Sequence, residues 1–159
     1  MKRTKNEKFA LAVVMALALS LPLLSSAVYA VPGSTLKVNG KLNGTLETPY
    51  GPMPDTIVIE LKAKGDGSSF VAGSGSLHGI NCGATFFFDA LTVTSVGHDK
   101  IVFEGPVTGS NTPASGFIEM GTSIVFETSL SGDHMTLTIN VNGLGEVFHD
   151  STGSGKVVL

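Results

Sequence analysis

The stretch Ser129–Gly143, SLSGDHMTLTINVNG, decides the fold class of this chain. From Met135 to Asn142 it alternates one apolar with one polar residue. Successive side chains of a β-strand point to opposite faces of the sheet, so a period of two predicts a strand with one buried and one solvated face. The serine, glycine and aspartate at 131–133 are typical of a tight turn. The stretch therefore predicts a hairpin in an antiparallel sheet.

The same alternation recurs upstream, in STLKVNGKLNGTLE at 34–47 and in DTIVIELKAK at 55–64. All twenty glycines lie after residue 30, where they gather with serine and threonine into short clusters between apolar runs. That part of the sequence has no apolar stripe of helical period. We expect strands at 35–47, 56–64, 68–78, 84–95, 100–108, 116–130, 134–142, 145–149 and 154–159.

The predicted fold class is all-β, a single-domain antiparallel meander of about eight to ten strands that closes into a barrel or folds into a sandwich. In ATFFFDALTVTS, at 84–95, strict alternation places Phe88 on one face and Phe87 and Leu91 on the other. We therefore expect part of this strand to be covered on both sides. The segment TPYGPMPD, at 48–55, contains three prolines and predicts a stiff, prominent loop.

Residues 1–30 are predicted to form a helical signal peptide, and residues 31–159 the all-β domain. Four basic residues and one acid precede an apolar run at 9–24, and the small residues Val28 and Ala30 suit recognition by a signal peptidase. The alternative is a retained segment that spans a membrane, since the apolar run is nearly long enough for this. In either case we expect the domain to be secreted, to an extracellular or periplasmic location.

The charge of the chain after residue 30 excludes several partners. It has six lysines, no arginine and twelve acidic residues, so its formal net charge is −6. A negative field repels nucleic acid and anionic membrane surfaces, so we expect no nucleic-acid partner and membrane contact only through the signal peptide. Cys82 is the single cysteine and cannot form an internal disulfide. We expect it to be a small, semi-buried residue rather than a reactive thiol.

Three of the four histidines stand next to an aspartate in the sequence. Imidazole and carboxylate together suit zinc or another divalent metal, so these pairs are candidate metal ligands. They are His98, Asp99, Asp133, His134, His149 and Asp150. The alternative is that the aspartates serve turns and the histidines are ordinary surface residues. No spacing matches a known zinc or calcium motif, so we expect no cofactor other than such a metal.

Whether the candidate ligands meet depends on Gly121. If residues 116–130 form one strand bent at Gly121, a meander brings four turns to one rim of the sheet. These turns lie at 65–67, 96–99, 131–133 and 150–153. If Gly121 is instead a turn between two strands, the later turns move to the opposite rim and the candidate ligands separate.

We expect no enzymatic activity, because no serine lies in GxSxG and no serine or cysteine has an activating context. The first functional hypothesis is an exported structural or adhesive module that assembles with copies of itself or with surface or matrix partners. The strand at 84–95 and the end segments VPGSTLKV and GSGKVVL could supply the contacts. The alternative hypothesis is a barrel that binds one small apolar molecule, which requires an interior that phenylalanine and leucine do not fill. A module that binds a divalent metal through the aspartate and histidine turns is a further alternative.

Overall fold

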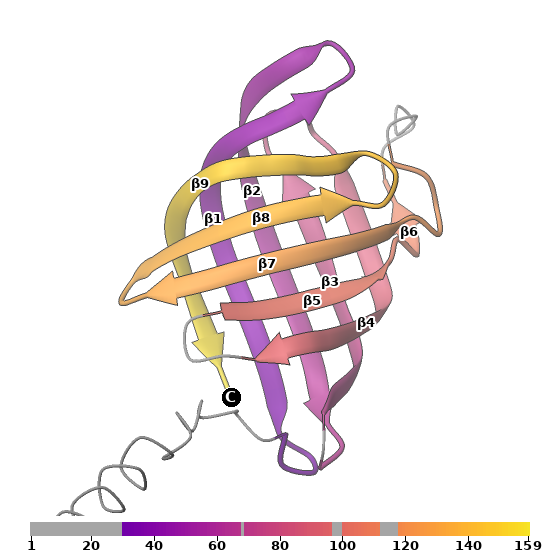
Figure 1. Ribbon diagram of the computed structural model, residues 1–159, viewed down its shortest axis with the longest axis vertical. Coiled ribbons are helices and arrows are strands. Elements are labelled where there is room, and N and C mark those ends of the chain that lie inside the picture. Colours follow the sequence, from indigo (N-terminus) through magenta and orange to yellow (C-terminus); the bar gives the residue numbers. More distant parts are fainter. Residues whose placement is uncertain (1–29, 68, 97–99, 112–117) are drawn as a thin grey trace, which may run out of the picture.

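Nine antiparallel strands make up the regular structure of the computed structural model, which describes residues 30–67, 69–96, 100–111 and 118–159 (Figure 1). Residues 1–29, within the predicted signal peptide, and the candidate ligands His98 and Asp99 lie outside the described residues. The strands are β1 (Thr35–Thr48), β2 (Gly51–Gly65), β3 (Phe70–Gly79), β4 (Thr85–Val96), β5 (Lys100–Pro106), β6 (Gly109–Ser110), β7 (Ser123–Ser131), β8 (His134–Val141) and β9 (Gly145–Val158).

The strands close into a barrel in the order in which they follow one another along the chain. Eight of them, all except β6, form a ring of antiparallel neighbours, which the pairing of β9 with β1 completes. The two-residue strand β6 lies in the β5–β7 connection and pairs with the start of β4. The predicted all-β meander is confirmed, and its form is a barrel. The described residues include no helix that is long and apolar enough to cross a membrane.

The two ends of the barrel are set by this up-and-down order. One end, called the mouth end below, carries the β1–β2, β3–β4, β5–β7 and β8–β9 connections. The other, called the far end, carries the β2–β3, β4–β5 and β7–β8 connections.

The core follows the predicted alternation. Met135, Leu137, Ile139 and Val141 of β8 are each at most 3% exposed, and the matching positions of β1 and β2 are buried as well. Four phenylalanines from four strands fill the middle of the barrel, and Phe88 and Phe126 meet edge to face with ring centroids 5.0 Å apart. The four are Phe88, Phe103, Phe126 and Phe148.

Strand β4 contains a β-bulge that simple alternation did not predict. Phe88 pairs with Gly75 and Leu91 pairs with Gly73, so two residues of β4 oppose one residue of β3. The extra residue shifts the alternation by one, and both Phe88 and Leu91 face the core. The prediction that Leu91 shares a face with Phe87 is therefore wrong. Phe87 faces outward and is 43% exposed, so the outer side of the strand is not covered there.

The proline-rich segment at 48–55 is mostly strand rather than loop. A two-residue turn, Pro49–Tyr50, joins β1 to β2, and Pro52 and Pro54 lie within β2. Proline has no N–H to donate, and this costs little here because β3 ends at Gly79 and does not flank this part of β2. The prediction of a stiff loop is wrong, but the hairpin does project beyond the rest of the barrel (Figure 1).

Strand β9 runs unbroken through 150–153, where the sequence analysis predicted a turn between two strands. Asp150 has a φ of 50° and lies where the registers with β1 and β8 both shift, so it belongs to a β-bulge. Aspartate adopts this left-handed conformation more readily than most residues do, and the same property favours it in turns. Next to the bulge the Ser151 hydroxyl accepts a hydrogen bond from Leu137 N–H and donates one to the Leu137 carbonyl, both at 2.6 Å.

Strand β7 begins at Ser123, so the predicted strand at 116–130 is too long. Gly121, with a φ of 84°, belongs to a turn that ends the β5–β7 connection. β7 nevertheless pairs directly with β5. The β7–β8 turn therefore lies at the same end as the β2–β3 turn, as the first alternative predicted.

Candidate functional site

An apolar cavity of about 290 Å³ opens at the mouth end of the barrel. Seven strands each contribute at least one apolar side chain to its wall, and among the described residues that line it only Thr48, Tyr50 and Cys82 carry a hydroxyl or thiol group. The apolar wall includes Leu46, Ile57, Leu77, Phe86, Ile139 and Val147. None of the four core phenylalanines lines the cavity, so the filled part of the barrel forms its floor.

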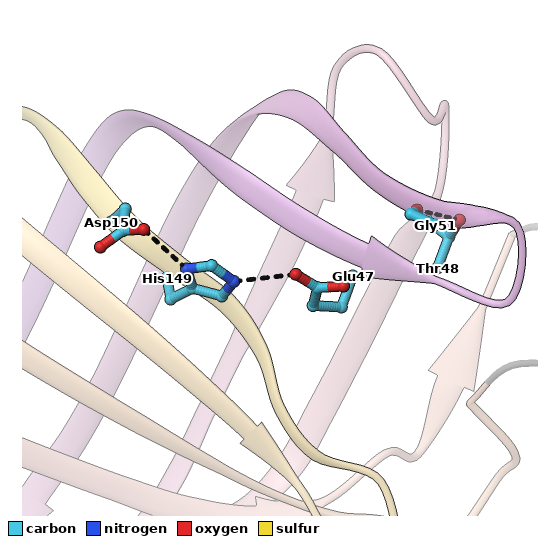
Figure 2. Close-up of polar contacts among 5 residues, drawn as sticks. All are labelled: Glu47, Thr48, Gly51, His149 and Asp150. Atoms are coloured by element: carbon cyan, nitrogen blue, oxygen red, sulfur yellow. Dashed lines mark hydrogen bonds and ion pairs between the residues drawn. The ribbon is translucent and has the colours of Figure 1, made fainter.

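The projecting β1–β2 hairpin forms one side of the cavity. Pro49, Tyr50 and Met53 line it from this hairpin, beyond the point where β3 ends. The hydroxyl of Thr48 donates to the carbonyl of Gly51 at 2.7 Å and accepts from the backbone N–H of Tyr50 at 3.2 Å, which fixes the turn (Figure 2). A wall of this kind, held by a short turn, is expected to keep its shape without a ligand.

In its described part, each connection at the mouth end exposes a large apolar side chain. Tyr50 is 99% exposed at the tip of the hairpin, and Ile80, Met120 and Leu144 lie in the other three connections. In the described part of the far end the turns carry serine, glycine and aspartate, and the exposed apolar residues there lie near the chain ends. Apolar surface therefore continues from the cavity onto its rim.

A buried carboxylate lies behind the cavity wall. Asp55 is 2% exposed and accepts backbone N–H groups from Thr56 at 2.6 Å, Asn81 at 2.8 Å and Cys82 at 3.4 Å. These bonds hold the β3–β4 turn, so Asp55 positions Cys82 at the cavity. Partial burial, followed by the hydrogen bond to Asp55, raises the pKa of the Cys82 thiol. A thiol whose pKa is raised is a weak nucleophile, but Cys82 is exposed as a residue, so the expectation that it is semi-buried is wrong.

The alkylation of Cys82 is expected to require a higher pH than that of an ordinary thiol, because its pKa is raised. The rate of reaction with iodoacetamide is measured as a function of pH, with glutathione as the control. The rate for Cys82 should reach half of its maximum at a higher pH than the rate for glutathione does. Replacing Asp55 with asparagine should lower that pH, because one cause of the shift is removed. If the pH profile of wild-type Cys82 matches that of glutathione, the contact between Cys82 and Asp55 is contradicted. Circular dichroism checks that the Asp55→Asn variant is folded.

His149 of β9 lies between two carboxylates near the mouth end (Figure 2). Its Nε2 is 3.0 Å from Oε1 of Glu47 in β1, and its Nδ1 is 3.1 Å from Oδ2 of Asp150. The hydrogen bonds to Glu47 and then to Asp150 raise the pKa of His149, because both stabilise the imidazolium. With both ring nitrogens engaged, this imidazole has no lone pair free for a metal.

His149 is expected to make the stability of the barrel depend on pH. A group whose pKa is raised by folding stabilises the protein fully below its unfolded pKa, about 6.5, and loses that contribution as the pH rises through the folded value. The difference in unfolding free energy between the wild type and His149→Gln should therefore shrink as the pH rises above about 6.5. Urea titrations at a series of pH values measure it.

The matched control is His78→Gln. The Nδ1 of His78 is 2.8 Å from the hydroxyl of Thr85. The partner of His78 in that contact is an uncharged hydroxyl, so this variant controls for the loss of an imidazole that makes no ion pair there. If the difference in unfolding free energy between the wild type and His149→Gln stays constant or grows with pH, the assigned ion pairs of His149 are contradicted.

The six predicted metal ligands are not brought to one rim. Asp133 and His134 are exposed at the β7–β8 turn of the far end. His149 and Asp150 lie within β9 toward the mouth end, where His149 contacts Glu47, because the turn expected at 150–153 does not exist. Within the described residues no group of three or more histidine, cysteine, aspartate or glutamate side chains could hold a metal ion. A metal site that includes His98 and Asp99 stays a prediction.

A wider hollow of about 470 Å³ lies on the outer surface of β1 to β4. The hollow exists because Gly75 and its two serine neighbours are small. Phe87 and Lys62 border it. The hollow is open to solvent and lined by charges of both signs, so it would bury less of a ligand than the mouth cavity does.

The cavity and its neighbours are the basis for any functional argument. Comparison of the chain with protein-family models, with curated proteins and with solved structures gives no match.

Proposed function

We propose that the protein binds a small apolar molecule in the mouth cavity and performs no chemistry on it. The observation that carries this proposal is an apolar hollow of about 290 Å³, enclosed by side chains from seven strands and by the projecting hairpin. Its volume is at the lower end of the range of ligand pockets, about 300–1,000 Å³, which favours a ligand with a single medium-length alkyl chain. Burial of that chain would supply the affinity.

A fluorescent probe tests the proposal. N-phenyl-1-naphthylamine is uncharged and becomes bright in an apolar site, so purified protein should enhance its emission saturably and 1-decanol should displace it. Occupancy should also slow the alkylation of Cys82, which lines the cavity. Phe87→Ala, on the outer surface, is the control and should bind the probe like the wild type. If the wild type gives no saturable enhancement, the proposal is wrong.

A structural or adhesive module remains the second candidate. The exposed Phe87 on β4 and the apolar connections of the mouth end favour self-association. Strand donation by the chain ends is less favourable than the sequence suggested, because β1 and β9 already pair with each other. Light scattering across a range of concentrations should show oligomers if this candidate holds, and a strict monomer would exclude self-assembly. For either function we propose an exported protein, on the basis of the first thirty residues.

A further inference from the structure

The charged groups around the mouth cavity are mainly acidic. Glu47, Glu119 and Glu146 each stand next in sequence to a residue that lines the cavity, and all three are at least partly exposed. The lysines lie elsewhere: the strand registers place Lys41 near the middle of the barrel and the others toward the far end. Those others are Lys37, Lys62, Lys64, Lys100 and Lys156.

Two histidines lie toward the mouth among the described residues: His78, which is exposed and alternates with the inward-facing Leu77 of β3, and His149, whose contacts occupy it. Both of its ring nitrogens face protein carboxylates, Glu47 on one side and Asp150 on the other. An imidazolium in this position neutralises part of the acidic surface but has no N–H left for the head group of a ligand.

Asp55 adds a negative charge from inside the wall. Its carboxylate is 2% exposed, and it accepts three backbone N–H groups and the Cys82 thiol rather than pairing with a cation. Cys82, whose N–H and thiol are among these donors, lines the cavity. Because charges in a poorly hydrated region are screened less than at the surface, this carboxylate disfavours a second negative charge in the mouth.

We propose that the mouth cavity selects amphiphiles whose head group is cationic or uncharged and discriminates against carboxylates with the same alkyl chain. This inference rests on the proposed binding function. A carboxylate head held at the mouth would lose part of its hydration with no cation to replace it. A quaternary ammonium head would lie among Glu47, Glu119 and Glu146, and an alcohol would carry no charge to repel.

Three ligands with the same chain length test this selectivity. Decyltrimethylammonium, 1-decanol and decanoate, each below its micelle-forming concentration, would compete with N-phenyl-1-naphthylamine at neutral pH. We expect decyltrimethylammonium to bind about tenfold more tightly than decanoate, and the ratio to fall in about 0.5 M sodium chloride. If none of the three displaces the probe, the proposed function itself fails. If decanoate binds as tightly as the cation, the cavity is a binding site but the selectivity inference is overturned.

Two double variants test whether the carboxylates at the mouth cause the selectivity. Glu119→Gln with Glu146→Gln removes two charges at the mouth and should lower the ratio of the two affinities. Glu60→Gln with Asp133→Asn removes two exposed charges, one on the outer face of β2 and one at the far end, and should leave the ratio unchanged. Both variants change the net charge equally, so an equal effect in the two would overturn the assignment to the mouth carboxylates.

Discussion

Replacing Gly153 with valine is expected to lower the free energy of unfolding by about 3 kcal/mol or more. Gly153 lies on β9, where this strand pairs with β8 on one side and with β1 on the other. A Cβ at this position would overlap the carbonyl oxygen of Lys41 and lie 2.7 Å from Cα of Leu42. Both are backbone atoms of β1, so relief would require the two strands that close the barrel to separate.

Urea denaturation followed by circular dichroism measures this loss. Gly109→Ala is the control, because a Cβ there would approach only the Phe87 side chain, at 3.3 Å, in ordinary strand conformation. The control should stay within about 1 kcal/mol of the wild type. If Gly153 instead lay in a solvent-exposed turn, as the sequence suggested, valine would be tolerated. An unchanged denaturation midpoint would therefore contradict the continuous strand β9.

Local patterning predicted the parts of the fold in which each strand alternates without interruption. Residues 135–141 and 57–63 show it: every second residue, starting from Met135 and Ile57, is apolar and buried, because one face of the sheet packs against a core. Alternation did not distinguish a barrel from a sandwich. That choice depends on whether β9 reaches β1, a contact between residues more than a hundred positions apart.

Two of the errors occur at β-bulges, one at Asp150 in β9 and one in β4. Asp150 and its neighbours have the composition of a turn, and no local signal separates a turn from a bulge that needs the same left-handed conformation. In β4, the residue added between Phe88 and Leu91 changes which side chains face inward. Both bulges are imposed by the curvature of a closed barrel, which is a property of the whole fold.

The candidate site was only partly foreseeable. Asp55 stands two residues before Ile57, in the same alternating series, so the pattern does place a carboxylate on the inward face of β2. This pattern could have identified Asp55 as a candidate site residue, because a buried carboxylate needs hydrogen-bond or ion-pair partners. The cavity could not be read from sequence, because it depends on how far the hairpin projects beyond β3. The ion pair of Glu47 with His149 joins residues 102 positions apart and left no local signal.

Filling the mouth cavity is expected to abolish ligand binding without unfolding the barrel. Ala84 lines the cavity and is only half-buried, so an indole ring introduced by Ala84→Trp would enter the hollow rather than the packed core. The affinity for N-phenyl-1-naphthylamine should fall at least about thirtyfold, equivalent to about 2 kcal/mol, because the probe and the indole compete for the same volume. The loss is measured by titration of the probe.

The matched control is Ala90→Trp, which makes the same substitution at an exposed position of β4. The chain has no tryptophan of its own, so the emission of each variant reports the surroundings of one indole. Emission from Ala84→Trp should be shifted to the blue, as from an apolar site, whereas emission from Ala90→Trp should resemble that of an indole in water. If the indole at position 84 emits at the blue wavelength and the probe still binds with its original affinity, the probe occupies another site. The mouth cavity would then not be the binding site, because one hollow of about 290 Å³ cannot hold both ring systems.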